Sequence, residues 1–317
     1  MMRTTIRTKI SRFLLPLIAL IIVMATGVTG MAASGKGVHK SFATPDEAAK
    51  SLAAAVKNND SKELLAILGP GAQSIVSSGD PVEDQAGRER FARLYDEKCV
   101  IEGSGSGKAV LTLGNEEYPF PIPLVKKGTS WFFDTRAGKE ELLNRRIGRN
   151  ELQVIEVLRA YVDAQREYAS KDRDGDGITA FAQRIRSTPG KNDGLYWEAR
   201  EGEEESPFGP FAAKAAREGY TQSKSEKPTP YHGYIFRIMK AQGKDVEGGA
   251  FDYVVNGKMI LGFALLAYPA KYGSSGIMTF IVNQNGVVYQ KDLGKKTGTI
   301  AAAIKRYNPD SSWKKVE

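Results

Sequence analysis

A long amphipathic segment near the middle of the chain limits the possible folds more than any other stretch. Across residues 140–170, apolar and small side chains recur every three or four positions, which places them on one face of an α-helix. They are Val154, Leu158, Tyr161, Val162, Gln165, Tyr168 and Ala169. Gly148 is expected to bend or break the first part of this helix. The helix divides the sequence in two, and we expect it to connect two domains.

The part before this helix predicts helices followed by strands. Thr44 and Pro45 are typical of a helix start, and further helices are expected at Ser61–Leu68 and at 84–97. Alternating or aromatic runs then predict strands at 109–113, 118–125 and 130–134. Pro121 and Pro123 suggest an edge position for the second strand. Helices packed on an antiparallel meander form an α+β domain, and the layout resembles the cystatin-like or nuclear-transport-factor-like (NTF2-like) folds.

The part after the long helix also predicts an α+β arrangement. Short helices are expected at 178–186, 208–218 and 300–307. Strands are expected at 233–239, 258–268, 276–282 and 286–291. The turn sequence Asn283 to Gly286 lies between the last two strands and predicts a hairpin.

The N-terminus has the three parts of a secretory signal peptide. Arg3, Arg7, Lys9 and Arg12 form a basic stretch without any acid, and an apolar run of about 13 residues follows at 13–25. Ala32 or Ala33 would occupy the cleavage position. The alternative is a retained anchor, but a bilayer-spanning helix needs about 20 apolar residues. We therefore expect cleavage, no membrane span in the mature protein, and a periplasmic or extracellular location.

Removing this signal changes the charge balance. The chain has 45 basic and 37 acidic residues, a net charge of +8. Without the four basic residues of the signal the count is 41 against 37, a net of +4. So small an excess does not predict a nucleic-acid partner. The length beyond the signal suggests two domains, which we place at 34–138 and 172–317, with the connecting helix at 139–171.

Four stretches of the chain closely resemble a family of secreted bacterial proteins. They are Phe132 to Thr135 with Arg145 to Gly148, residues 160–165, residues 187–197 and residues 262–286. The family is domain-of-unknown-function family 2950, and the resemblance implies an exported protein without implying any site residue. The second half alone also resembles the soluble heads of pilins and pseudopilins, although the N-terminal segment that defines pilins is missing.

An Asp-rich segment after the long helix is the best candidate for a ligand site. Asp172, Asp174 and Asp176 alternate along the chain and Gly177 follows them. Carboxylates at alternate positions of a turning chain converge on one point, as in calcium loops. Gln183 stands where an EF-hand has its bidentate Glu, so a complete EF-hand is not expected. The alternative is a polar turn without a metal. Calcium is the one cofactor that the sequence predicts.

Other motifs carry less information. The Gly-rich run 103–108 departs from a phosphate loop, with Glu102 in place of the first Gly and Ala109 in place of Ser/Thr, so no nucleotide is expected. His39 is assigned to the linker. His232 enters a strand, but no serine elbow supplies a nucleophile for a triad. The only cysteine, Cys99, is expected to be a small buried residue at a strand start.

Aromatic side chains of the second half fit either a groove for a glycan or peptide, or a core. They are Tyr196, Trp197, Phe208, Phe211, Tyr231 and Tyr234. No catalytic residue is predicted. We expect a non-catalytic binding or scaffolding protein of the cell envelope, with an envelope protein or polymer as its partner. The alternative is a cell-envelope hydrolase acting on peptide or glycan.

Overall fold

The computed structural model describes residues 39–220 and 228–316, which fall within one compact unit, Gly37–Glu317. Helices and antiparallel sheets alternate along the chain, so the α+β class is confirmed. The predicted signal peptide and most of the predicted linker lie outside the described residues. The domain boundaries inferred from the sequence stay a prediction.

Four helices come first, and polar side chains cap three of them. The helices are α1 (Pro45–Lys57), α2 (Ser61–Leu68), α3 (Gln73–Val76) and α4 (Pro81–Glu97). Thr44, Asp60 and Asp80 each accept a backbone N–H of the first turn, which satisfies donors that have no partner inside the helix. The predicted third helix thus starts three residues earlier than expected, at the Asp80 cap.

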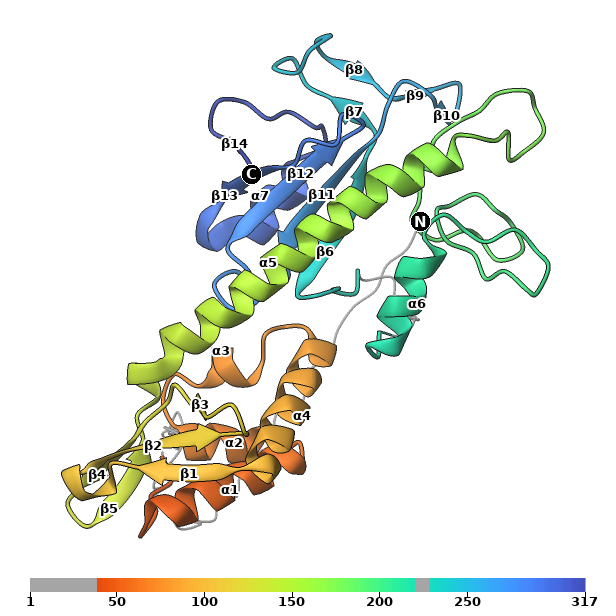
Figure 1. The fold of residues 1–317 in the computed structure, drawn as a ribbon. Coiled ribbons are helices and arrows are strands. Elements are labelled where there is room, and N and C mark those ends of the chain that lie inside the picture. The colour runs from red at the N-terminus through yellow and green to blue at the C-terminus, as the bar shows by residue number, and fades with distance from the viewer. Residues whose placement is uncertain (1–38, 221–227, 317) are drawn as a thin grey trace, which may run out of the picture. The chain divides into compact units, whose positions relative to one another are not determined.

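A five-stranded antiparallel sheet follows these helices (Figure 1). Its strands are β1 (Cys99–Glu102), β2 (Lys108–Leu113), β3 (Tyr118–Pro119), β4 (Leu124–Lys127) and β5 (Ser130–Phe133). The order is β1-β2-β4-β5, and β3 also pairs with β2. The predicted strand 118–125 is two strands, because Pro121 and Pro123 have no N–H to donate to a ladder. Leu52, Leu111 and Phe133 belong to the core between helices and sheet.

The long helix α5 (Thr135–Tyr168) is continuous over 34 residues. The helix is unbroken at Gly148, which corrects the expectation of a break there. A Cβ at Gly148 would have no atom outside its own stretch of helix within 4 Å, so the position faces open space. Leu158 and Tyr161 of its second half are fully buried in the core of the C-terminal sheet.

The C-terminal sheet also has five antiparallel strands, in the order β14-β13-β12-β11-β6. They are β6 (Tyr234–Met239), β11 (Ala264–Pro269), β12 (Met278–Asn283), β13 (Tyr289–Asp292) and β14 (Lys314–Lys315). The β12–β13 pairing confirms the predicted hairpin. Helices α5 and α7 (Thr297–Ala303) both pack on β11, whose first four residues are all buried. Full burial of successive residues requires that both faces of the strand are covered.

Smaller elements complete the second half. They are α6 (Gly209–Arg217), β7 (Ala241–Gln242), β8 (Phe251–Asp252), β9 (Val254–Val255) and β10 (Lys258–Met259). The predicted strand 258–268 is divided into β10 and β11. Gly262 lies between them with a φ of +148°, a backbone conformation that L residues rarely adopt and that ends the extended run.

The helix predicted at 178–186 is wrong. This segment is irregular and forms isolated bridges, Phe181 with Met259 and Arg186 with Tyr196. The buried Gln165 side chain replaces helical hydrogen bonds: its Oε1 accepts the Ala182 N–H and its Nε2 donates to the Ala182 carbonyl, both at 2.8 Å. A side chain from α5 therefore satisfies this backbone, and local helix propensity does not decide its conformation.

Candidate functional site

The Asp-rich segment forms a tight loop shortly after α5. Asp172 organises it: Oδ1 accepts the Gly175 N–H at 2.9 Å and Oδ2 accepts the Gly177 N–H at 2.7 Å. Gly175 and Gly177 have φ of +74° and +85°, which glycine adopts without a steric cost. Hydrogen bonds to the loop, that of Gly177 above all, lower the pKa of Asp172 below its usual range.

The structure brings the three predicted carboxylates together. One oxygen each from Asp172, Asp174 and Asp176 lies within 4.8 Å of the others, and all three residues are exposed. Hard oxygen donors at this spacing are what calcium prefers. Gln183 does not join them, because its amide donates to the Gly257 carbonyl and accepts from Lys240. This agrees with the expectation that the loop is not a complete EF-hand.

A lysine that the sequence analysis did not identify faces this loop. Lys258 Nζ lies 2.9 Å from Asp174 Oδ1 and 2.5 Å from Asp176 Oδ2. These hydrogen bonds raise the pKa of Lys258 and lower that of Asp176. The ammonium therefore balances part of the negative charge that a metal ion would otherwise neutralise. Lys258 is 84 positions from Asp174, so no sequence spacing could have revealed it.

A cavity of about 460 Å³ adjoins the loop. Asp174 and Lys258 line it, together with the irregular segment 178–184 and residues 191–193. A second cavity, of about 390 Å³, is lined by Tyr196, Trp197 and Pro210. Both volumes are within the ordinary range of small-molecule sites.

Of the aromatic residues considered for a groove, only Tyr196 and Trp197 line either cavity. Trp197 is only 9% exposed, and the Arg173 guanidinium lies 5.1 Å from its ring. Tyr234 is fully buried, as the alternative of a core position for these aromatic residues predicted.

A second cluster gathers acids around His232, between α4 and β6. His232 Nδ1 lies 2.8 Å from Glu83 Oε1, and Nε2 lies 3.2 Å from Glu218 Oε2. Asp80 Oδ2 accepts the Gly233 N–H at 2.8 Å and the Tyr220 hydroxyl at 2.9 Å. The sequence analysis missed the acids because Glu83 lies 149 positions from His232, so no local pattern connects them.

The backbone of this cluster is a tight hairpin turn. Tyr231 and Tyr234 exchange two backbone hydrogen bonds, and the central residues His232 and Gly233 have φ of +48° and +73°. Positive φ at both central positions is typical of a type I′ turn, where Asn-Gly is the usual pair. His232 occupies the strained position and is held by the carboxylates on either side of its ring.

The centre of this cluster is buried, whereas Glu83 and Glu218 at its edge keep part of their side chains exposed. Asp80 is 1% exposed and His232 is 6% exposed, and neither lines one of the two cavities. Burial raises the pKa of Asp80, whereas the hydrogen bond from His232 lowers that of Glu83. The hydrogen bonds and ion pairs of Asp80, Glu83, Glu218 and His232 link the start of α4 to the start of β6. We call this polar network the His232 joint.

The turn at residues 273–276 adds to this joint and supplies no free nucleophile. The Ser274 hydroxyl donates to the Ser74 carbonyl at 2.9 Å, and the Ser275 hydroxyl donates to the Lys271 carbonyl at 3.2 Å. Both serines are at most 1% exposed. Backbone hydrogen bonds from Gly273 to the Gly276 carbonyl and from Ser274 to the Lys271 carbonyl form this turn.

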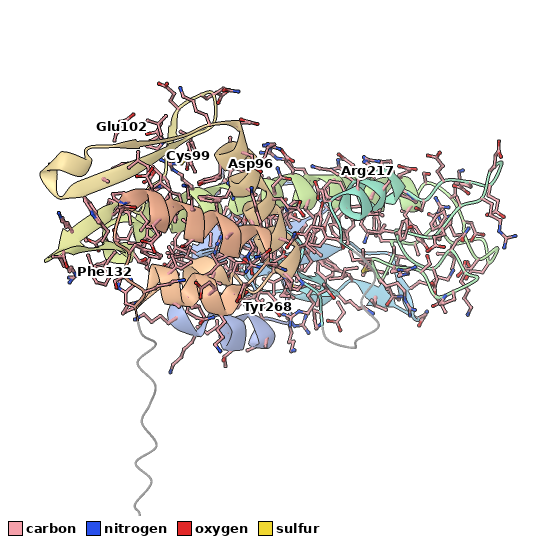
Figure 2. All side chains as sticks on the ribbon, turned by 90° about the horizontal axis from the view of Figure 1, so that it is seen from below. Asp96, Cys99, Glu102, Phe132, Arg217 and Tyr268 are labelled. Carbon is pink, nitrogen blue, oxygen red and sulfur yellow. The ribbon has the colours of Figure 1, made fainter. Side chains whose placement is uncertain are left out.

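His39 and Cys99 lie elsewhere. His39 was assigned to a linker, but its ring packs 5.3 Å from that of Phe132 and against Gly69, so it belongs to the folded unit. Cys99 starts β1 as predicted, but it is partly exposed and not buried as expected. Figure 2 labels it between Asp96 and Glu102. Burial raises the pKa of its thiol, which disfavours the reactive thiolate. Within the described ranges, no helix is both long and apolar enough to cross a membrane.

Comparison with known proteins gives one match. The profile of the family described as "Protein of unknown function (DUF2950)" matches residues 39–316. No curated protein and no solved structure matches the chain significantly, and the likeness to pilin heads and to cystatin-like folds is not confirmed.

Proposed function

We propose a function for this chain from its own residues, because it belongs to the DUF2950 family, whose description assigns no activity. The proposal is an exported, non-catalytic binding or scaffolding protein of the bacterial cell envelope that calcium stabilises. The observation that supports this best is the separation of its two polar clusters. The oxygen donors of the Asp loop are exposed beside an open cavity, whereas Asp80 and His232 of the second cluster are buried and Glu83 and Glu218 are only partly exposed.

Burial argues against catalysis at the His232 cluster. A general acid or base must come within hydrogen-bond reach of the substrate. With Asp80 1% exposed and His232 6% exposed, no substrate atom reaches them unless the joint opens. The hydrogen bonds that occupy Asp80 favour a structural role.

Export is the part of the proposal that rests on sequence. The basic stretch and the short apolar run at residues 3–25 are typical of a cleavable signal. Cell fractionation and N-terminal sequencing of the natural protein test it. An uncleaved N-terminus, or recovery from the cytoplasm, would reject this location.

Calcium binding is proposed for Asp172, Asp174 and Asp176. Three carboxylates within 4.8 Å supply half of the six or more oxygens that calcium takes, and water or backbone carbonyls would supply the rest. Lys258 competes for the same carboxylates. We therefore expect a weak site, with a dissociation constant in the range of extracellular modules, about 0.1–1 mM.

Thermal unfolding with calcium tests this part. At ten times its dissociation constant, a ligand adds about 1.4 kcal/mol to the folded state, which raises the midpoint by about 3 °C. Asp174→Ala should abolish the increase, and Lys258→Met should enlarge it by removing the competing ammonium. Asp163→Ala is the matched control, because Asp163 is 79% exposed on α5. No increase in the wild type, or an equal increase in Asp174→Ala, would reject the site.

The partner, an envelope protein or polymer, would be sought by retention of envelope components on the immobilised protein. Retention that requires calcium and is lost in Asp174→Ala would place the loop at the binding surface.

A cell-envelope hydrolase acting on peptide or glycan is the second candidate, because three acids converge with His232. Turnover of peptide or cell-wall glycan by the purified protein, lost in Glu83→Gln while the thermal midpoint is kept, would establish it. No turnover under conditions where the protein is folded favours the binding role.

A further inference from the structure

The cavity beside the Asp loop is lined by more basic than acidic side chains. Its volume of about 460 Å³ suits a ligand about as large as a sugar phosphate. Two acidic side chains line it, Asp174 and Asp193. Five basic side chains line it, namely Arg173, Arg184, Lys191, Lys240 and Lys258.

Three of these basic groups already have acidic partners. Arg173 lies 3.1 Å from Glu204, and its guanidinium is held between two aromatic rings. Arg184 lies 3.6 Å from Asp193. Lys258 is bound to the Asp loop. Both cavity carboxylates are therefore neutralised from within the protein.

Lys191 and Lys240 have no such partner. Among the described residues, neither ammonium lies within 4 Å of a carboxylate; Lys240 donates only to the Gln183 amide oxygen, at 2.8 Å. Both lysines line the same cavity, so an anion bound there would meet two positive charges that no carboxylate of the described residues neutralises. Ammonium groups bind phosphate and carboxylate through charge-assisted hydrogen bonds, which are the stronger kind.

One wall of the cavity is apolar. Phe181 and Met259, joined by an isolated backbone bridge, line it together with Ile178, which is 48% exposed. Such a wall suits the ring or carbon skeleton of a ligand, while the lysines suit its charged groups. Inorganic anions alone would leave the apolar wall unused.

We propose that this cavity binds a small organic anion that carries phosphate or carboxylate groups, held by Lys191 and Lys240. The inference rests on the proposed binding function, for which it names the ligand class. The small net charge beyond the signal segment, +4, and the limited volume both argue against a nucleic acid.

Calorimetric titration of the purified protein tests the inference. The probes are glucose 6-phosphate as the phosphate arm, tricarballylate as the carboxylate arm, and uncharged glucose as the control. The buffer is freed of calcium with a chelating resin, since a soluble chelator is itself a polyanion. At least one of the anions should bind saturably with one site per chain, and its affinity should fall as salt is added.

Lys191→Gln with Lys240→Gln should weaken this binding by about 100-fold, since each charge-assisted hydrogen bond contributes about tenfold. The matched control is Lys50→Gln with Lys62→Gln, two exposed lysines of α1 and α2. It should bind like the wild type. Thermal midpoints of both variants confirm folding.

Three results would overturn the inference. They are no saturable binding of either anion up to about 10 mM, glucose binding as tightly as the anions, or equal affinity in the two double variants. The calcium test gives a separate answer, because this titration contains no calcium. A failed anion titration leaves the calcium site standing, and the reverse also holds.

Discussion

Two glycines of α5 offer a matched test of how closely the helix packs on the first sheet. A Cβ on Gly138 would lie 2.2 Å from the Pro121 carbonyl oxygen and 2.6 Å from the Ile122 nitrogen. A Cβ on Gly148, ten residues along the same helix, would have no atom within 4 Å. Neither glycine has a positive φ, so alanine fits the backbone at both sites.

The two substitutions should change stability in opposite directions. Glycine to alanine in a helix interior adds about 0.5–1 kcal/mol, and Gly148→Ala should keep all of this gain. At Gly138 the same gain is opposed by a clash with backbone atoms that requires a shift of about 1 Å. Overpacking of this kind costs about 1–3 kcal/mol, and a rigid backbone neighbour places the cost at the upper end. We expect a net loss of about 2 kcal/mol for Gly138→Ala.

Urea unfolding of both variants, followed by far-UV circular dichroism, measures the difference. The midpoint should rise for Gly148→Ala and fall for Gly138→Ala, with an unchanged dependence on urea. If Gly138→Ala were as stable as Gly148→Ala, α5 would not approach the 121–122 backbone as described. If Gly148→Ala were destabilising, the site would not be open.

Two further predictions concern the His232 joint. Glu83→Gln should make the free energy of unfolding less dependent on pH in the acid range. The hydrogen bond from His232 lowers the pKa of Glu83 below its usual 4.5, so the ionised carboxylate stabilises the fold above pH 4.5. This stabilisation is lost as the pH falls through the lowered pKa. Unfolding free energies from neutral to acid pH measure this, and an unchanged slope would contradict it. Asp80→Ala should lower the free energy of unfolding in urea by about 3 kcal/mol, because it removes the α4 cap and leaves the buried Gly233 N–H and the partly buried Tyr220 hydroxyl without their acceptor. A loss below about 1 kcal/mol, the value of a cap alone, would show that the joint is weak.

Local patterns predicted the elements whose hydrogen bonds are local. The helix over 140–170 and the turn at Asn283 to Gly286 depend on neighbours in sequence, and both are present. The segment 178–186 has a helical pattern, yet the Gln165 side chain binds the backbone of Ala182 and a bridge binds Phe181. Such tertiary hydrogen bonds override weak local preference, and no sequence window includes them.

The candidate sites also contain some residues that local sequence predicted and others that only the fold brings together. Asp172, Asp174 and Asp176 are close in sequence, so their convergence followed from the loop alone. Their counter-ion Lys258 comes from β10, and the acids around His232 come from α4 and from the end of α6. Only the pairing of distant elements brings these groups together, and sequence spacing does not encode that pairing.

The two proposed ligands share one side chain, and this constrains how they act on each other. Lys258 bonds Asp174 and Asp176 and also lines the cavity. Calcium at the loop would displace its ammonium, which would leave an unneutralised positive charge on a side chain that lines the cavity. A bound anion could then neutralise that charge. The coupling must be reciprocal, so the factor by which calcium tightens the anion equals the factor by which the anion tightens calcium. Because Lys258 carries the coupling, replacing it with methionine should remove the dependence while leaving each ligand its own site. A protein that held calcium and an anion in this way would bind the anion more tightly where calcium is plentiful.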